Sequence, residues 1–235
     1  MYILVILANP SYWNISDQSL FTKSQNENDF DIKANHYQLV ELNQQALNYD
    51  ILSNKNIKSH ISLPLPDGDF EVFEIQEVSI MEPGLAVKYP EFRTFRGKSM
   101  DGTQSLIMDF THKGLHAVIK SSSGYVWIDP INRETNKLHM SYYKKDLQSK
   151  NTGWQCNMEE DNFSSEPLLN SNKNNASEEA QGGTLPTNEM TLKTYRIAVA
   201  ATAEYTSFHG GTVKDGMAAI VTAMNRVNGI YEVEV

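Results

Sequence analysis

Ser105-Leu-Ile-Met-Asp-Phe110, Leu115-His-Ala-Val-Ile-Lys120 and Gly124-Tyr-Val-Trp-Ile-Asp129 decide the fold of this 235-residue chain. The three segments are rich in apolar residues and follow one another at intervals of about ten residues, with Gly, Ser and Lys between them. Such spacing is typical of an antiparallel β-meander. His139-Met-Ser-Tyr-Tyr143 extends the pattern by one further expected strand.

A β-hairpin is expected before the meander. Residues 59–63 and 70–78 flank Pro66-Asp67-Gly68-Asp69, where Asp and Gly tolerate the backbone angles of a tight turn. Asp67 and Asp69 also suggest a calcium loop, but its regular ligand spacing and closing Glu are missing. We further expect a loop over residues 11–35, strands at 37–42 and 93–97, and short helices at 43–50, capped by Asn43, and at 83–89.

The composition changes after residue 156. Residues 157–190 hold seven acidic residues and one lysine, with many Asn and Ser and few large apolar residues. Such a segment cannot bury enough surface to offset its ordering entropy. We therefore predict a disordered acidic linker at 157–190, which separates a β-rich front domain at 36–156 from a second domain at 191–235.

The second domain opens with one expected strand and one expected helix. Residues 192–202 are apolar on both faces at their end, as in a central strand of a covered sheet. Thr212-Val-Lys-Asp215 resembles a capping box before a helix of about 19 residues. Its apolar face is predicted to comprise Val213, Met217, Ile220, Met224, Val227 and Tyr231. One strand and one helix cannot close a core, so we expect this domain to continue beyond residue 235.

Bulk properties exclude some functions. The net charge of −9 argues against a nucleic-acid backbone partner, and a single cysteine excludes an internal disulfide. The apolar run at residues 1–8 is too short to span a membrane. It fits either a clipped signal peptide, within an N-terminal segment at 1–35, or a buried strand.

Few residues suggest chemistry. The chain has no HExxH helix, no GxSxG elbow and no phosphate-binding glycine loop. His112 and His116 flank a turn, so we expect strand residues rather than a metal pair, and we expect Trp127 to pack. His209 precedes a helix, where it orders the loop or helps to bind an anion. Cys156 is either an inert thiol or a thiolate that reaches a metal elsewhere.

Two stretches together resemble one family. Residues 192–211 together with residues 217–232 resemble the start of the catalytic domain of reprolysin-like (metzincin) zinc metallopeptidases, which are secreted bacterial proteins. The most specific part is Met224-Asn-Arg-Val-Asn-Gly-Ile-Tyr-Glu232. Residues 63–97, Gly114-Leu-His-Ala-Val-Ile119 and Val126-Trp-Ile-Asp-Pro130 are similar to the pro-region of their precursors. The resemblance covers roughly residues 59–156 and 191–235.

This resemblance implies an α+β chain: a mainly antiparallel β pro-domain, an acidic linker, and the first strand and helix of an α/β catalytic domain. It implies a secreted zinc metalloendopeptidase precursor whose pro-region helps folding or inhibits the protease. The zinc ligands and general base of the HExxH helix would lie beyond residue 235, so the chain alone is predicted to be inactive.

The resemblance also suggests partners and processing. The expected partners are the chain's own catalytic domain and the peptide substrates of the parent enzyme, with no nucleic acid and no membrane span. Cys156 would be an inhibitory zinc ligand, and processing would fall near Gly182, Gly183, Thr184 and Leu185. The alternative is a non-enzymatic secreted β-domain that binds a protein partner.

Overall fold

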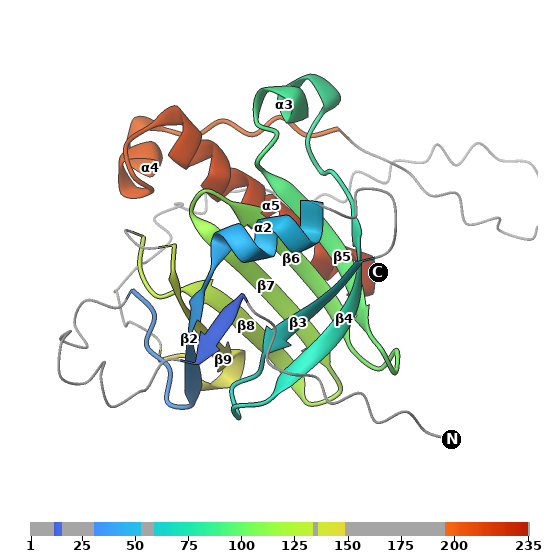
Figure 1. Ribbon diagram of the computed structural model, residues 1–235. Helices are drawn as coiled ribbons and strands as arrows, with labels where there is room; N and C mark the ends of the chain where they lie inside the picture. The colour runs from blue at the N-terminus through green and yellow to red at the C-terminus, as the bar shows by residue number, and fades with distance from the viewer. Residues whose placement is uncertain (1–11, 16–30, 53–58, 134–135, 149–195, 235) are drawn as a thin grey trace, which may run out of the picture. The chain divides into compact units, whose positions relative to one another are not determined.

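The computed structural model describes residues 12–15, 31–52, 59–133, 136–148 and 196–234 (Figure 1). One compact unit combines the chain up to residue 149 with residues 199–235. The contacts described below all lie within this unit, so they join the front domain to the beginning of the predicted second domain.

Nine strands and four α-helices make up the described elements. In chain order they are β1 (Trp13–Ile15), β2 (Tyr37–Leu42), α2 (Gln44–Leu52), β3 (Ser59–Pro64), β4 (Phe70–Glu77), α3 (Pro83–Lys88), β5 (Arg93–Ser99), β6 (Ser105–Thr111), β7 (Gly114–Ser121), β8 (Gly124–Pro130), β9 (Leu138–Tyr143), the 3₁₀ turn η2 (Lys144–Asp146), α4 (Ala203–Phe208) and α5 (Val213–Glu234).

The strands form a single antiparallel sheet in the order β1-β2-β9-β8-β7-β6-β5-β4-β3. Strands β3 to β9 therefore lie beside their neighbours in the chain, as the predicted hairpin and meander require. The predicted α+β class, with a mainly antiparallel β front domain, is confirmed. The hairpin turn is confirmed too, because Gly68 adopts a φ of 98° that favours glycine.

The sheet curls around its main core (Figure 1). Side chains at one edge, in and next to β1, contact the other edge strand, β3. Trp13 Nε1 donates a hydrogen bond of 2.9 Å to the carbonyl oxygen of Ser62 on β3. The Ser62 N–H in turn donates to the Tyr12 hydroxyl at 2.8 Å. These bonds satisfy backbone groups of an edge strand that would otherwise be open to another chain.

Strand β6 has two different faces because side chains alternate along a strand. Leu106, Met108 and Phe110 point into the main core. Asp109 points the opposite way and contacts α5, and Ile107 lies against Gly229 of the same helix. The sheet is thus covered on both faces at this strand, which explains why β6 is buried almost throughout.

Two segments differ from the expectation. Residues 13–15 form β1, where a loop was predicted; a strand of three residues gives no periodic signal in the sequence. The expected strand at 192–202 does not form in its described part, 196–202, which has no regular structure. Ile197 and Val199 there are 72% and 46% exposed, and no described strand pairs with them.

The short helices form as predicted. Asn43 Oδ1 accepts a 3.1 Å hydrogen bond from the Ala46 N–H, which caps α2. Glu82 caps α3 in the same way, by accepting from the N–H groups of Gly84 and Leu85. None of the helices among the described residues combines the length and apolarity that a membrane crossing needs.

His139 is a buried histidine of the sheet whose protonation should destabilise the fold. Its Nε2 accepts a hydrogen bond from the Leu115 N–H, and its Nδ1 lies 3.1 Å from the Lys137 carbonyl. Burial lowers the pKa of His139 from 6.5 to about 4. The folded state therefore holds the neutral ring, while the unfolded chain takes up a proton below pH 6.5.

We expect the unfolding free energy to fall by roughly 3 kcal/mol as the pH decreases from 6.5 to 4, because of His139 alone. Stability from this group is fully present above pH 6.5 and levels off at its lower value below pH 4. Urea denaturation of the wild type and of His139→Gln across this range measures the effect. An equal slope in both proteins would contradict it.

Candidate helix-docking site

Helix α5 begins with a capping box at Thr212 and Asp215. The Asp215 N–H donates to Thr212 Oγ1 at 3.1 Å, and the Thr212 N–H donates to Asp215 Oδ2 at 3.3 Å. The predicted helix start is thereby confirmed. The helix extends to Glu234, three residues beyond the last apolar position that the sequence pattern contained.

The buried face of α5 is not the predicted apolar face. Val213, Val227 and Tyr231 are 75%, 42% and 64% exposed. Most buried positions instead follow the spacing 3, 4, 3 and 4 on another face, Asp215, Ala218, Thr222, Asn225 and Gly229, with Gly216 and Val221 buried beside them. We call the five residues with this spacing the polar strip. It lies against the sheet because the sheet's outer face carries polar groups that need partners.

Gly229 allows α5 to approach β6 closely. A Cβ atom at this position would lie 2.2 Å from Ile107 Cδ1 and 2.5 Å from its Cγ1. Real side chains do not approach so closely, so any residue larger than glycine must displace Ile107 or the helix. Glycine lowers helix propensity, and the close contact gives a reason for it here.

Asp109 is the centre of the contact between β6 and α5. It is almost fully buried, and its Oδ2 accepts a hydrogen bond of 2.6 Å from the Thr222 hydroxyl. Asn225 Nδ2 donates to the Met108 carbonyl at 3.0 Å and lies 3.4 Å from Asp109 Oδ1. His116 Nδ1 is 3.4 Å from Asp109 Oδ2, within ion-pair distance but without hydrogen-bond geometry.

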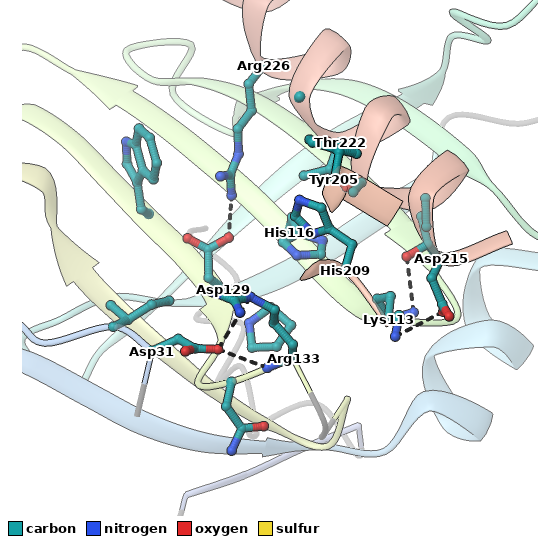
Figure 2. Close-up of a pocket in the computed structure, with 18 of the residues that line it drawn as sticks. Asp31, Lys113, His116, Asp129, Arg133, Tyr205, His209, Asp215, Thr222 and Arg226 are labelled. Carbon is teal, nitrogen blue, oxygen red and sulfur yellow. Dashed lines mark hydrogen bonds and ion pairs between the residues drawn. The ribbon is translucent and has the colours of Figure 1, made fainter. Parts of the chain in front are cut away.

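A second buried carboxylate, Asp129 on β8, pairs with Arg226 of α5 (Figure 2). The Tyr142 hydroxyl donates to the other Asp129 oxygen at 2.9 Å. Burial opposes ionisation, but Arg226, His116 and the Tyr142 hydroxyl together hold the pKa of Asp129 below its usual value. Arg226 also lies over the Trp127 ring, 4.6 Å from its centroid, so Trp127 packs as predicted.

At both ends of the contact the acid belongs to α5 and the base to its partner, the reverse of the Asp129–Arg226 pair. Near the start of α5, Asp215 Oδ1 lies 2.8 Å from His112 Nε2 and 2.9 Å from Lys113 Nζ, both on the turn between β6 and β7. Near its end, Glu232 receives two hydrogen bonds from Arg96 of β5, at 2.6 and 3.0 Å. Burial of Asp215 favours its neutral form, but His112, Thr212 and Lys113 outweigh this effect. They hold the pKa of Asp215 far below its usual value.

A small apolar cluster completes the contact. Ala218 and Val221 of α5 are buried against Phe92, which precedes β5. The ring of Phe92 stacks on that of His112, with centroids 5.7 Å apart. The helix is therefore held by apolar packing as well as by polar groups.

A cavity of about 390 Å³ opens between α4, α5 and the strand ends (Figure 2). Its walls include Lys113, Arg133 and Arg226, but each cation faces an acid: Asp215, Asp31 and Asp129. The cavity thus has no excess of either charge that would select a charged ligand.

The histidines singled out in the sequence lie near this cavity. His116 and His209 line it, while His112 pairs with Asp215. His209 ends α4, and its ring contacts that of Tyr205 at 4.4 Å, as expected of a residue that orders a turn. Among the residues that the structure describes, no group of three or more His, Cys, Asp or Glu side chains could hold a metal ion.

The predicted inhibitory cysteine and the predicted processing region cannot be placed. Cys156 and the segment with Gly182, Gly183, Thr184 and Leu185 lie outside the described residues, as does the predicted linker.

The residues that hold α5 on the sheet were not predicted from the sequence, because Asp109, Asp129 and Arg226 are single polar residues in segments far apart in the chain. An aspartate within each of two apolar strands was the only sequence signal.

Comparison with known proteins gave no relative. The chain matches no protein-family model, no curated protein and no solved structure.

We expect Gly229→Ala to lower the unfolding free energy by about 1 to 3 kcal/mol, because the new methyl group overlaps Ile107. On an exposed helix the same change would stabilise the protein by up to about 1 kcal/mol. Urea denaturation measures the sign. Ile230→Ala is the control, because Ile230 is the next residue and is exposed; this change should cost less. A Gly229→Ala protein more stable than the wild type would contradict the close approach.

Proposed function

We propose that the chain is the N-terminal part of a secreted zinc metallopeptidase precursor, and that its front domain holds the first helix of its own catalytic domain. Peptide-bond hydrolysis belongs to the full-length parent. The front domain assists folding of the catalytic domain, inhibits it, or does both. The proposal joins the sequence resemblance to the docking of α5.

The observation that carries the proposal is the orientation of α5. The helix buries its polar strip against the sheet and leaves exposed much of the apolar face that its sequence pattern presents. An amphipathic helix normally buries its apolar face in its own domain. Met217 at the start of this face packs against the front domain, but Val213, Val227 and Tyr231 remain exposed, and a helix with apolar residues left for a further core fits the start of a second domain.

Residues 199–202 support the same interpretation. Val199, Ala200 and Ala201 line a groove of about 280 Å³ with Ile220 and Met224 of α5. This groove lies on the apolar side of the helix. In the proposal, the apolar segment becomes a strand when the sheet of the catalytic domain is present to pair with it.

Zinc is the cofactor of the proposed parent enzyme. The described residues offer no ligand set for it, so the proposal places the ligands and the general base after residue 235. The part that these residues have in the reaction is to bind and position the catalytic domain.

If the gene continues past residue 235, as the proposal requires, the longer product should hydrolyse casein with zinc and lose this activity on chelation. Residues 1–235 should hydrolyse nothing under either condition. A fluorogenic casein assay with and without added zinc compares the two. Zinc-dependent hydrolysis by residues 1–235 alone would overturn the proposal, as would a gene without an HExxH sequence after this position.

Cys156 gives a separate prediction within the proposal. If its thiolate is a ligand of the parent's zinc, Cys156→Ser should make the uncut precursor active, because water then takes the vacated position on the metal. Latency is measured as precursor activity relative to the processed enzyme. Equal latency in both proteins would leave Cys156 as an inert thiol, without affecting the docking of α5.

The alternative is a non-enzymatic secreted β-domain that binds a protein partner. The apolar face of α5 favours it, since exposed apolar surface often marks a protein interface. The two candidates differ in the sequence after residue 235. A stop codon there favours the binding domain, and a zinc-binding helix favours the peptidase.

A further inference from the structure

We infer that the outer face of β5–β8 is a receptor for α5 that works without a covalent connection. After the chain is cut between residues 149 and 195, the segment that contains α4 and α5 stays bound to the front domain. The partner that fits this surface is a helix with the polar strip and charges of α5.

Charge complementarity fixes the position of the helix on the sheet. In the middle of the contact the sheet contributes the acids Asp109 and Asp129, and the helix contributes Thr222 and Arg226. At both ends the signs are reversed, since sheet bases meet helix acids. Of the charges that face the sheet, Asp215, Arg226 and Glu232 give the order acid, base, acid along the helix, and their partners Lys113, Asp129 and Arg96 give base, acid, base.

This arrangement disfavours other positions of the helix. A shift by one helical turn, about 5.4 Å along its axis, would move Arg226 away from Asp129 and Asp215 away from Lys113. Asp129 would then be buried without its cation, which is strongly unfavourable. The surface therefore selects one register and direction, as specific interfaces do when wrong pairings carry a cost.

Close packing adds affinity to this selectivity. Gly229 approaches Ile107 closely, and Phe92, Ala218 and Val221 form a buried apolar cluster beside the charged pairs. Buried aromatic and charged anchors of this kind dominate the binding energy of protein interfaces. The contact has a buried ion pair, hydrogen bonds and an apolar anchor, so it has the parts of an independent interface.

The inference rests on the proposed function in one respect, that a protease separates the two parts in the parent protein. The test uses the full chain with a specific protease site in place of Gly182-Gly183-Thr184-Leu185. After complete cutting at neutral pH, we expect the two parts to elute together in size-exclusion chromatography. Separate elution of the wild-type parts would overturn the inference.

Arg226→Met tests whether the buried pair holds the helix. We expect the cut segment to bind at least about thirtyfold more weakly, because Asp129 loses its cation while it remains buried. Lys214→Met is the matched control on the same helix. Lys214 and its partner Glu91 are 48% and 39% exposed, so water screens their pair and binding should change less than about threefold.

Two further measurements separate a loss of binding from a loss of folding. Circular dichroism of the uncut Arg226→Met protein checks that the sheet still forms. Asp129→Asn, alone and combined with Arg226→Met, should give losses that are far from additive. If Arg226→Met and Lys214→Met weaken binding equally, the buried Asp129–Arg226 pair does not hold the helix and the inference fails. Casein hydrolysis by the longer gene product tests the proposed function independently, so the two can fail separately.

Discussion

The buried carboxylates of Asp109 and Asp129 are the constraint on which the arrangement of the chain depends. Each lies on the outer face of an otherwise apolar strand, where an ionised group is stable only with close partners. Tyr142 and His116 of the sheet lie beside these acids, and α5 supplies the others: Thr222 and Asn225 for Asp109, and Arg226 for Asp129. The sheet therefore favours this helix in one position, which the helix meets through its polar strip and Arg226.

The alternation of strand side chains connects this constraint to the fold. Along β6, every second residue enters the enclosed core, and the residues between them face α5. The enclosed core makes the sheet rigid through packing and through the edge contacts of Trp13. The outer face can then carry polar groups at fixed positions, as a binding surface requires.

Sequence reasoning found most elements but not the docking. The strands and the hairpin were predictable because local alternation and turn residues such as Gly68 report them directly. The helix α5 was predicted, but the face that it turns to the sheet was not, because periodicity identifies an apolar face without saying which partner covers it. Arg226 and Asp129 are 97 residues apart in the sequence, and nothing local in either segment indicates that they meet. The expected strand at 192–202 does not form in its described part, 196–202, because strand formation depends on a neighbouring strand as well as on apolar residues.

Hydrogen exchange of the α5 backbone amides tests the central claim most directly, namely that α5 is held on the sheet by its polar strip. The account predicts that amides around Thr222 and Asn225 exchange as slowly as those of β6 in the intact chain, and that Asp129→Asn accelerates α5 while β6 stays protected. Fast exchange of α5 beside a protected β6 in the wild type would contradict it.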